Sequence, residues 1–291
     1  MTLLLAFLLE WLIGDPQSSW HPVALFGRWT LWCESLLYGD SCMSGVIAWL
    51  IVTIMPLGLL WGGHLYVGWL FDVLLLWAAL GWKSLFQHVQ AVIVSESRAE
   101  ARLSVAQIVS RDTAAMSEQD ARRAALESLA ENASDAVVAP LFWFLLLGPV
   151  GAVLYRMLNT LDAMWGYRNS RYQAFGWWAA RVDDVANWIP ARITAWLMLR
   201  VGRSTDWRVI QKQASTHASP NAGWPEVALA YAADVQLGGS VIRAGIIDER
   251  PFYGSDAARD ANMIAACEAL LIVRHALLLA ALLACGINLV L

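Results

Sequence analysis

Residues 156–194 read RMLNTLDAMWGYRNSRYQAFGWWAARVDDVANWIPARIT and lie between apolar segments. Arg, Asp and Asn recur through this stretch and alternate with Trp, Tyr, Phe and Met, whereas a solvated loop would be rich in Lys, Glu, Ser and Gly. Charged groups in such partly desolvated surroundings need partners or ligands. We interpret the stretch as part of a site for phosphate-bearing substrates at a membrane surface.

The composition places the chain among membrane proteins. Of its 291 residues 58% are hydrophobic and only 15% are charged, and mean hydropathy is +0.50. Soluble domains carry more charge, and the 17 Trp are typical of membrane–water interfaces. A net charge of −4 and the lack of a basic arm give no reason to expect a nucleic-acid partner.

The apolar runs predict helices. Residues 1–13 are too short to span a membrane, and we expect Glu10 to face protein. Residues 44–82 form a helical hairpin that turns at Gly62-Gly63. The apolar run 137–158 is interrupted at Gly148-Pro149, and residues 269–291 form a final helix. Between them we expect an amphipathic helix over 83–110, a helix over 117–137 with a capping box at 117–120, a short helix over 188–202, and a polar tract over 203–262.

The predicted fold class is all-α: a polytopic integral membrane protein with four to six membrane-embedded helical segments plus cytoplasmic helices and loops. We expect a single membrane-embedded domain over 1–291, with N-terminal membrane helices (1–82), cytoplasmic helices (83–136), a central motif region (137–202), a cytoplasmic loop region (203–268) and a C-terminal membrane helix (269–291). The sequence leaves homo-oligomer formation open.

The positive charge predicts the topology. Every Lys and Arg except Arg28 lies between residues 83 and 274. The positive-inside bias places both 83–136 and 156–192 on the cytoplasmic side, so 137–158 must be re-entrant or buried in protein. We therefore expect a multi-pass protein of the cell membrane, the inner membrane of a bacterium, with its active site facing the cytoplasm.

Three acidic residues share one predicted helical face, because Glu127, Glu131 and Asp135 stand four residues apart. Such a face is often merely solvated, and Arg122 and Arg123 could relieve its repulsion. The alternative is a Mg²⁺ site, since that ion takes carboxylate oxygens together with substrate phosphates. The apolar residues that follow Asp135 favour the metal site.

The 156–194 stretch offers further polar pairs at helical spacing: Asn159 with Asp162, Asp184 with Asn187, and Asp183 with Asn187. Guanidinium groups that suit phosphate come from Arg168, Arg171, Arg181 and Arg192. The alternative is a buried ion-pair network, with Arg181–Asp184 as an example. His21 stands beside a proline in a polar loop and could be structural or a general base.

The motifs together resemble the adenosylcobinamide-phosphate synthase (CbiB/CobD) family of cobalamin biosynthesis. The matching strings are GDP at 14–16, HPV at 21–23, GR at 27–28, VSRDT at 109–113, ESLAENASDAVVAPLFW at 127–143, the whole run from Tyr155 to Thr194, SPNAGWPEVALA at 219–230, LGG at 237–239 and RPFYG at 250–254. Two departures are Arg156, where we expect Lys, and the segment 241–245, where we expect an aromatic residue followed by Gly.

The resemblance implies a ligase that joins a carboxylate of a corrinoid, adenosylcobyric acid, to (R)-1-amino-2-propanol O-phosphate or ethanolamine phosphate, with ATP and Mg²⁺ as cofactors. A carboxylate is a poor electrophile, so we expect activation as an acyl phosphate and a base that deprotonates the amine. The implied assignment makes Glu127, Glu131 and Asp135 the metal residues, and Asp162, Asp183, Asp184 and His21 the catalytic ones. Binding of substrate and phosphate falls to Arg111, Asp112, Asn159, Arg168, Arg171, Arg181, Asn187, Arg192 and Asn221.

Three other functions compete with this interpretation. A related branch of the superfamily acts as a non-catalytic membrane signalling protein, but the acidic and Asn positions retained here favour an enzyme. Intramembrane prenyltransferases also place acidic residues at this spacing, but they need about twice as many clear spans. A transporter would show an inverted repeat of broken helices, and none is evident.

Overall fold

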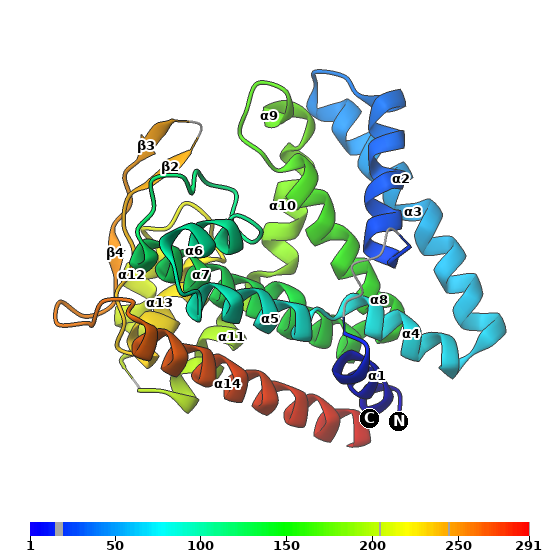
Figure 1. The fold of residues 1–291 in the computed structure, drawn as a ribbon. Coiled ribbons are helices and arrows are strands. Elements are labelled where there is room, and N and C mark those ends of the chain that lie inside the picture. The colour runs from blue at the N-terminus through cyan, green and yellow to red at the C-terminus, as the bar shows by residue number, and fades with distance from the viewer. Residues whose placement is uncertain (15–19, 204, 244, 291) are drawn as a thin grey trace. The chain divides into compact units, whose positions relative to one another are not determined.

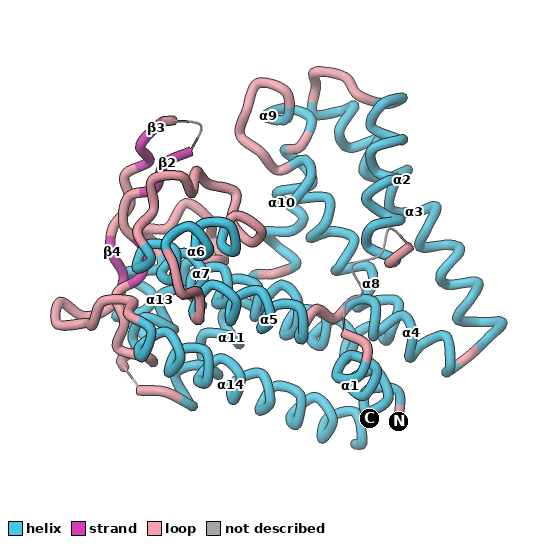
Figure 2. Tube along the Cα trace, in the orientation of Figure 1, coloured by secondary structure: helices cyan, strands magenta, loops and turns pink. Residues whose placement is uncertain are grey.

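The computed structural model describes residues 1–14, 20–203, 205–243 and 245–290. It confirms the all-α prediction, because helices form nearly all the regular structure (Figures 1 and 2). Four helical segments are long and apolar enough to cross a membrane, and α1 (Thr2–Leu12) is a shorter apolar helix. The four are Cys42–Val67, Trp69–Ile93, Glu118–Trp165 and Met263–Val290. The chain is therefore an all-α polytopic membrane protein.

The chain divides into two compact units, each assembled from segments distant in the sequence. Unit 1 comprises residues 1–81, 135–187 and 284–291, and unit 2 comprises residues 82–134 and 188–283. That the two units act as the single domain expected from the sequence stays a prediction.

Unit 1 is organised around α8. Its helices are α1, α2 (Pro22–Leu37), α3 (Cys42–Val67), α4 (Trp69–Ala79), α8 (Ala139–Trp165), α9 (Tyr172–Phe175) and α10 (Trp177–Ala186). α8 packs against α4, α10, α3 and α2. Trp165, Leu161 and Phe175 are fully buried in its core, and Glu10 on α1 is buried, as predicted.

Two glycines bend these helices. In α8 the helical backbone is interrupted at Gly148, whose φ is 71°, a value that glycine adopts without a steric penalty. Pro149 follows, and the predicted interruption is confirmed. In the 44–82 hairpin the predicted turn at Gly62-Gly63 is wrong: α3 continues to Val67, and the chain turns at Gly68, with φ of 73°. Gly63 instead makes room for packing, because a Cβ there would lie 2.5 Å from the Phe71 ring.

Unit 2 contains α5 (Trp82–Ile93), α6 (Arg98–Val105), α7 (Glu118–Ala133), α11 (Trp188–Val201), α12 (Trp207–Ala214), α13 (Gly223–Ala232) and most of α14 (Met263–Val290). α11 packs on α13, and α7 contacts both α5 and α13. The strands are β1 (Leu237–Gly238) paired with β4 (Phe252–Tyr253), and β2 (Val241–Arg243) paired with β3 (Ile246–Asp248), both antiparallel.

Several boundaries in unit 2 differ from expectation. The predicted 83–110 helix is two helices, α5 and α6. Leu85 and Val89 are buried in α5, and Ala101 and Val105 are buried in α6, whereas Leu103 is exposed. The polar 203–262 tract contains α12, α13 and the four strands, and α14 starts at Met263, six residues before the expected helix. The capping box of Ser117 and Asp120 is confirmed.

Candidate functional site

Unit 1 gathers amide and carboxylate groups around Asp135. This residue lies in a π-helical turn, Ser134–Val138, that joins α7 to α8. Asn187 Nδ2 donates to Asp135 Oδ1 over 2.6 Å, and Asn159 Nδ2 donates to Oδ2 over 3.2 Å. The two Asn residues predicted to pair with nearby aspartates therefore both contact Asp135. Single π-turns often occur at functional sites.

Asp183, on α10, faces other carboxylates and no cation. Only 8% of the residue is exposed, and Oδ1 has no hydrogen-bond partner within the described part of the chain. Burial raises the pKa of Asp183 well above its ordinary value, and the negative charges of Asp135 and Asp162 raise it further, while a hydrogen bond from the neutral Asn159 side chain opposes the shift. Three of the predicted aspartates are thus close enough to repel one another.

The neighbouring Asp184 is partly balanced. Arg181 Nη1 lies 3.5 Å from Asp184 Oδ2, the pair anticipated as an alternative to ligand binding, and the Arg181 side chain is 62% exposed. Burial raises the pKa of Asp184, while Arg181 and Arg168 lower it; burial prevails. Both arginines thus act on Asp184 and leave Asp183 uncompensated.

Two predicted site residues in unit 1 have structural contacts. Arg171 Nη2 donates to the buried Glu34 over 2.8 Å, and its guanidinium lies 4.3 Å from the centre of the Tyr38 ring. His21 caps α2, its Nδ1 accepting from the Val23 N–H over 3.4 Å. Phosphate binding by Arg171 and a base role for His21 stay predictions. Asp15 and Pro16 of the GDP string lie outside the described residues.

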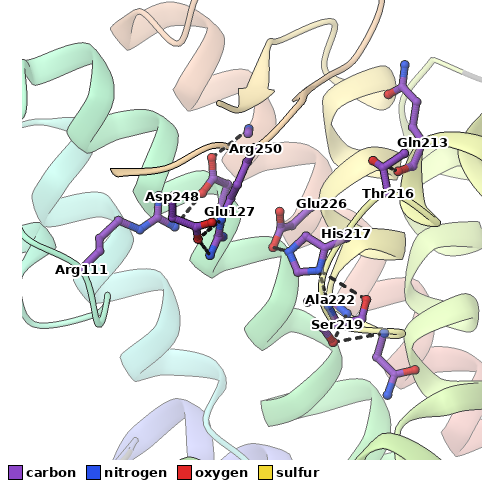
Figure 3. Close-up of polar contacts among 12 residues, drawn as sticks. Arg111, Glu127, Gln213, Thr216, His217, Ser219, Ala222, Glu226, Asp248 and Arg250 are labelled. Carbon is purple, nitrogen blue, oxygen red and sulfur yellow. Dashed lines mark hydrogen bonds and ion pairs between the residues drawn. The ribbon is translucent and has the colours of Figure 1, made fainter. Parts of the chain in front are cut away.

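Unit 2 contains a second charged cluster, between α7, α13 and the strands (Figure 3). Glu127 Oε2 accepts from Arg111 Nη2 over 2.7 Å, and Oε1 accepts from the Gly238 N–H over 2.9 Å. Arg250 pairs with Asp248 at 2.7 Å. Glu127 therefore already has a cationic partner and a backbone donor.

Glu226 is a site residue that the sequence analysis missed. It is 6% exposed, and its Oε1 lies 3.6 Å from His217 Nε2. Burial raises the pKa of Glu226 well above its ordinary value, and the negative charges of Glu127 and Glu131 raise it further. A single Glu inside the apolar string GWPEVALAYA was the available signal, since buried carboxylates are rare without a function.

Arg192 and Asn221 are brought together as part of unit 2. Arg192 Nη1 lies 3.4 Å from Asn221 Oδ1, and the guanidinium stacks over Trp188 and Trp224 at 4.1 and 4.5 Å from their ring centres. Burial lowers the pKa of Arg192. Both terminal nitrogens also donate to backbone carbonyls, Nη1 to Trp188 over 2.6 Å and Nη2 to Pro220 over 3.5 Å, so phosphate binding by Arg192 stays a prediction.

The donor set of unit 1 fits a hard cation such as Mg²⁺. It offers carboxylates, an orphaned buried oxygen on Asp183 and neutral amides. Over the described ranges no three His, Cys, Asp or Glu side chains converge closely enough to hold an ion by themselves. Mg²⁺ usually keeps water and substrate phosphates beside one or two carboxylates, so it does not require such a cage. The set Glu127, Glu131 and Asp135 stays a prediction.

Comparison with known proteins gives a consistent result. The family model described as CobD/Cbib protein matches residues 3–271. A cobalamin biosynthesis protein CobD of Stutzerimonas stutzeri is 44% identical over 89% of this chain and 88% of its own length. The CobD of Chromobacterium violaceum is 42% identical over 86% and 85%, and the CbiB of Salmonella typhimurium is 35% identical over 98% and 97%. No solved structure matches the chain.

Proposed function

Because the chain belongs to the CobD/CbiB family of cobalamin biosynthesis, we propose that it forms an amide bond between adenosylcobyric acid and an amino-alcohol phosphate. ATP and Mg²⁺ drive the reaction, on the cytoplasmic side of the membrane. The amine substrate is (R)-1-amino-2-propanol O-phosphate or ethanolamine phosphate.

The observation that carries this proposal is the uncompensated carboxylate of Asp183. It is buried against Asp135 and Asp162, and the donors supplied to Asp135 by Asn159 and Asn187 are neutral. Burial beside other carboxylates disfavours the charged form of Asp183, which is why its pKa is raised. A bound cation would favour the charged form and pair with it.

In the proposed reaction one or two carboxylates of the set Asp135, Asp162 and Asp183 would hold Mg²⁺ together with water and substrate phosphates, and Asn159 and Asn187 would keep Asp135 oriented. When bound, the ion neutralises charge on the phosphoryl group that activates the corrinoid carboxylate. Arg168 and Arg181 are exposed, and their charges act on Asp184, so a substrate phosphate could pair with them there. Asp184, half-buried and with a raised pKa, is the base candidate of unit 1.

The test is amide formation by the purified protein. Adenosylcobyric acid, ATP, Mg²⁺ and each candidate amine phosphate are incubated with protein in detergent, and product is followed by mass. Asp183→Asn should lower the rate by about 100-fold or more, the effect expected for a group that orients a metal. Glu268→Gln, which alters a half-exposed carboxylate, is the matched control and should retain the wild-type rate.

Two results would contradict the proposal. An Asp183→Asn variant with the wild-type rate would remove the aspartate cluster from the reaction. A folded wild-type protein that forms no product with either amine would favour the non-catalytic signalling branch instead.

A further inference from the structure

The acidic side of the charged cluster in unit 2 includes Glu226, whose side chain is only 8% exposed. Its Oε1 lies 3.6 Å from His217 Nε2, and among the described residues its carboxyl group has no hydrogen bond and no Arg or Lys partner. The negative charges of Glu127 and Glu131 act on it. A buried carboxyl group without donors offers acceptor capacity to a ligand.

The imidazole of His217 lies beside Glu226 and is uncharged. The Ser219 N–H donates to His217 Nδ1 over 2.9 Å (Figure 3). A ring nitrogen that accepts is unprotonated, so the neutral imidazole carries its hydrogen on Nε2, facing Glu226. Burial lowers the pKa of His217, which keeps the ring uncharged near neutral pH. The positive charge that Glu226 needs must therefore come from elsewhere.

The same cluster has a basic side made of Arg111, Arg243 and Arg250. Arg111 and Arg250 are paired with Glu127 and Asp248. Arg243 makes no ion pair with any described residue. Its pKa is lowered first by burial and then by the charges of Arg250 and Arg111. Three guanidinium groups that repel one another, with one of them unpaired, favour a bound anion.

Asp112 fixes the hairpin that carries Arg243. The Asp112 N–H donates to the Ile242 carbonyl over 2.9 Å, and its Oδ2 accepts from the Gly245 N–H over 2.8 Å. The hairpin is the segment in which this chain departs from the family pattern. Asp112 therefore acts as a positioning residue for the hairpin that carries Arg243.

We propose that the cluster binds a small zwitterion, with its ammonium group at Glu226, Glu127 and Glu131 and its phosphate at Arg243, Arg250 and Arg111. This inference rests on the proposed function, which requires an amine phosphate, and it assigns that substrate's site. A nucleoside triphosphate has no positive group near neutral pH, so it could not pair with the three carboxylates. An amine phosphate carries both charges that the two sides require.

Binding of O-phosphoethanolamine to the full-length protein in detergent tests the assignment, by calorimetry without corrinoid or ATP. Ethanolamine and inorganic phosphate serve as half-ligands. We expect each half-ligand to bind at least tenfold more weakly than the zwitterion, because each satisfies only one side. A charge-assisted hydrogen bond is worth a factor of this size or more.

Two variants separate the two sides. Arg243→Gln should weaken O-phosphoethanolamine and inorganic phosphate at least tenfold each. Glu226→Gln should weaken O-phosphoethanolamine at least tenfold and leave inorganic phosphate unchanged or tighter. Arg203→Gln, which alters an exposed pair with Asp234, is the control and should bind as the wild type does. Arg243 is exposed, so its variant keeps the test decisive should Glu226→Gln fail to fold.

Unchanged zwitterion binding by Arg243→Gln or by folded Glu226→Gln overturns the assignment, as does a loss confined to ATP binding. Amide formation separates this inference from the proposed function. If both variants form product with a normal KM for the amine, the assigned binding site is wrong and the proposed function stands. If the predicted binding pattern is seen but no product forms, the binding site stands and the proposed function is wrong.

Discussion

The buried carboxylate of Glu34 offers a test of whether Arg171 is structural or binds phosphate. Glu34 Oε1 accepts from Arg171 Nη2 over 2.8 Å and from the Tyr172 hydroxyl over 3.0 Å, while Oε2 accepts from Trp165 Nε1 over 2.9 Å. Its side chain is 5% exposed. Glu34→Gln keeps the shape but replaces one acceptor oxygen with an NH₂ donor. Because both oxygens accept, that NH₂ must face a donor in either orientation.

The expected loss of stability follows from these contacts. A buried donor left without its acceptor costs about 1–3 kcal/mol. The lost charge of the pair with Arg171, whose side chain is 53% exposed, adds little because water screens it. At roughly 2–4 °C per kcal/mol for chains somewhat smaller than this one, the apparent Tm should fall by about 2–12 °C.

Tryptophan fluorescence during heating in detergent measures this change, because the 17 Trp report on unfolding of the chain as a whole. Glu268→Gln removes a half-exposed pair with Arg259 and should lower the free energy of unfolding by less than about 1 kcal/mol. Arg171→Gln should lower Tm and leave the affinity for inorganic phosphate unchanged. Equal Tm values for Glu34→Gln and Glu268→Gln would refute the reasoning, and so would an Arg171→Gln variant that loses phosphate affinity at an unchanged Tm.

Two further perturbations have a defined sign. The raised pKa of Glu226 lies above its ordinary value of 4.5, so unfolding releases its proton between those pH values and wild-type stability falls as pH rises through them. Glu226→Gln should therefore melt higher than the wild type at about pH 8, and the difference should shrink towards about pH 5; a constant difference would contradict the raised pKa. In α3, Gly45→Ala places a Cβ against the Phe175 carbonyl and should cost about 1–3 kcal/mol or more, whereas Gly58→Ala meets open space and should stabilise the helix by about 0.5–1 kcal/mol. Equal melting temperatures for these two variants would show that α3 does not pack closely on Phe175.

The features of the fold that depend on local chemistry were predictable from the sequence. The Ser117–Asp120 capping box starts α7 where expected, because both partners lie within one turn. The Gly148-Pro149 break in α8 was also predictable, since glycine supplies the positive φ and proline cannot donate to the preceding turn. The long apolar runs likewise gave helices of spanning length.

Features that depend on distant contacts were not predictable. Gly62-Gly63 and Gly68 are equally good turn signals in the sequence, and the packing of Phe71 against Gly63 decides between them. A single helix over 83–110 with Leu85 and Val89 on its buried face would place Leu103 on that face too. Leu103 is exposed because α5 ends at Ile93 and α6 starts as a separate helix at Arg98.

The same distinction applies to the site. Helical spacing paired Asn159 and Asn187 with nearby aspartates, but both donate to Asp135, which comes from another segment. The contact of Arg171 with Glu34 could not be predicted either, because the two residues are far apart in the sequence. Composition signals the presence of polar groups in an apolar chain, and only tertiary structure determines their partners.

The buried carboxyl groups of this chain differ in whether they have a cationic partner. Arg171 and Glu34 show that this chain can satisfy a buried carboxylate completely when stability requires it. Asp183 in unit 1 and Glu226 in unit 2 are also buried, and neither pairs with an Arg or Lys among the residues described, although His217 lies 3.6 Å from Glu226. We therefore propose positively charged ligands for both, a metal ion at the first and an ammonium group at the second.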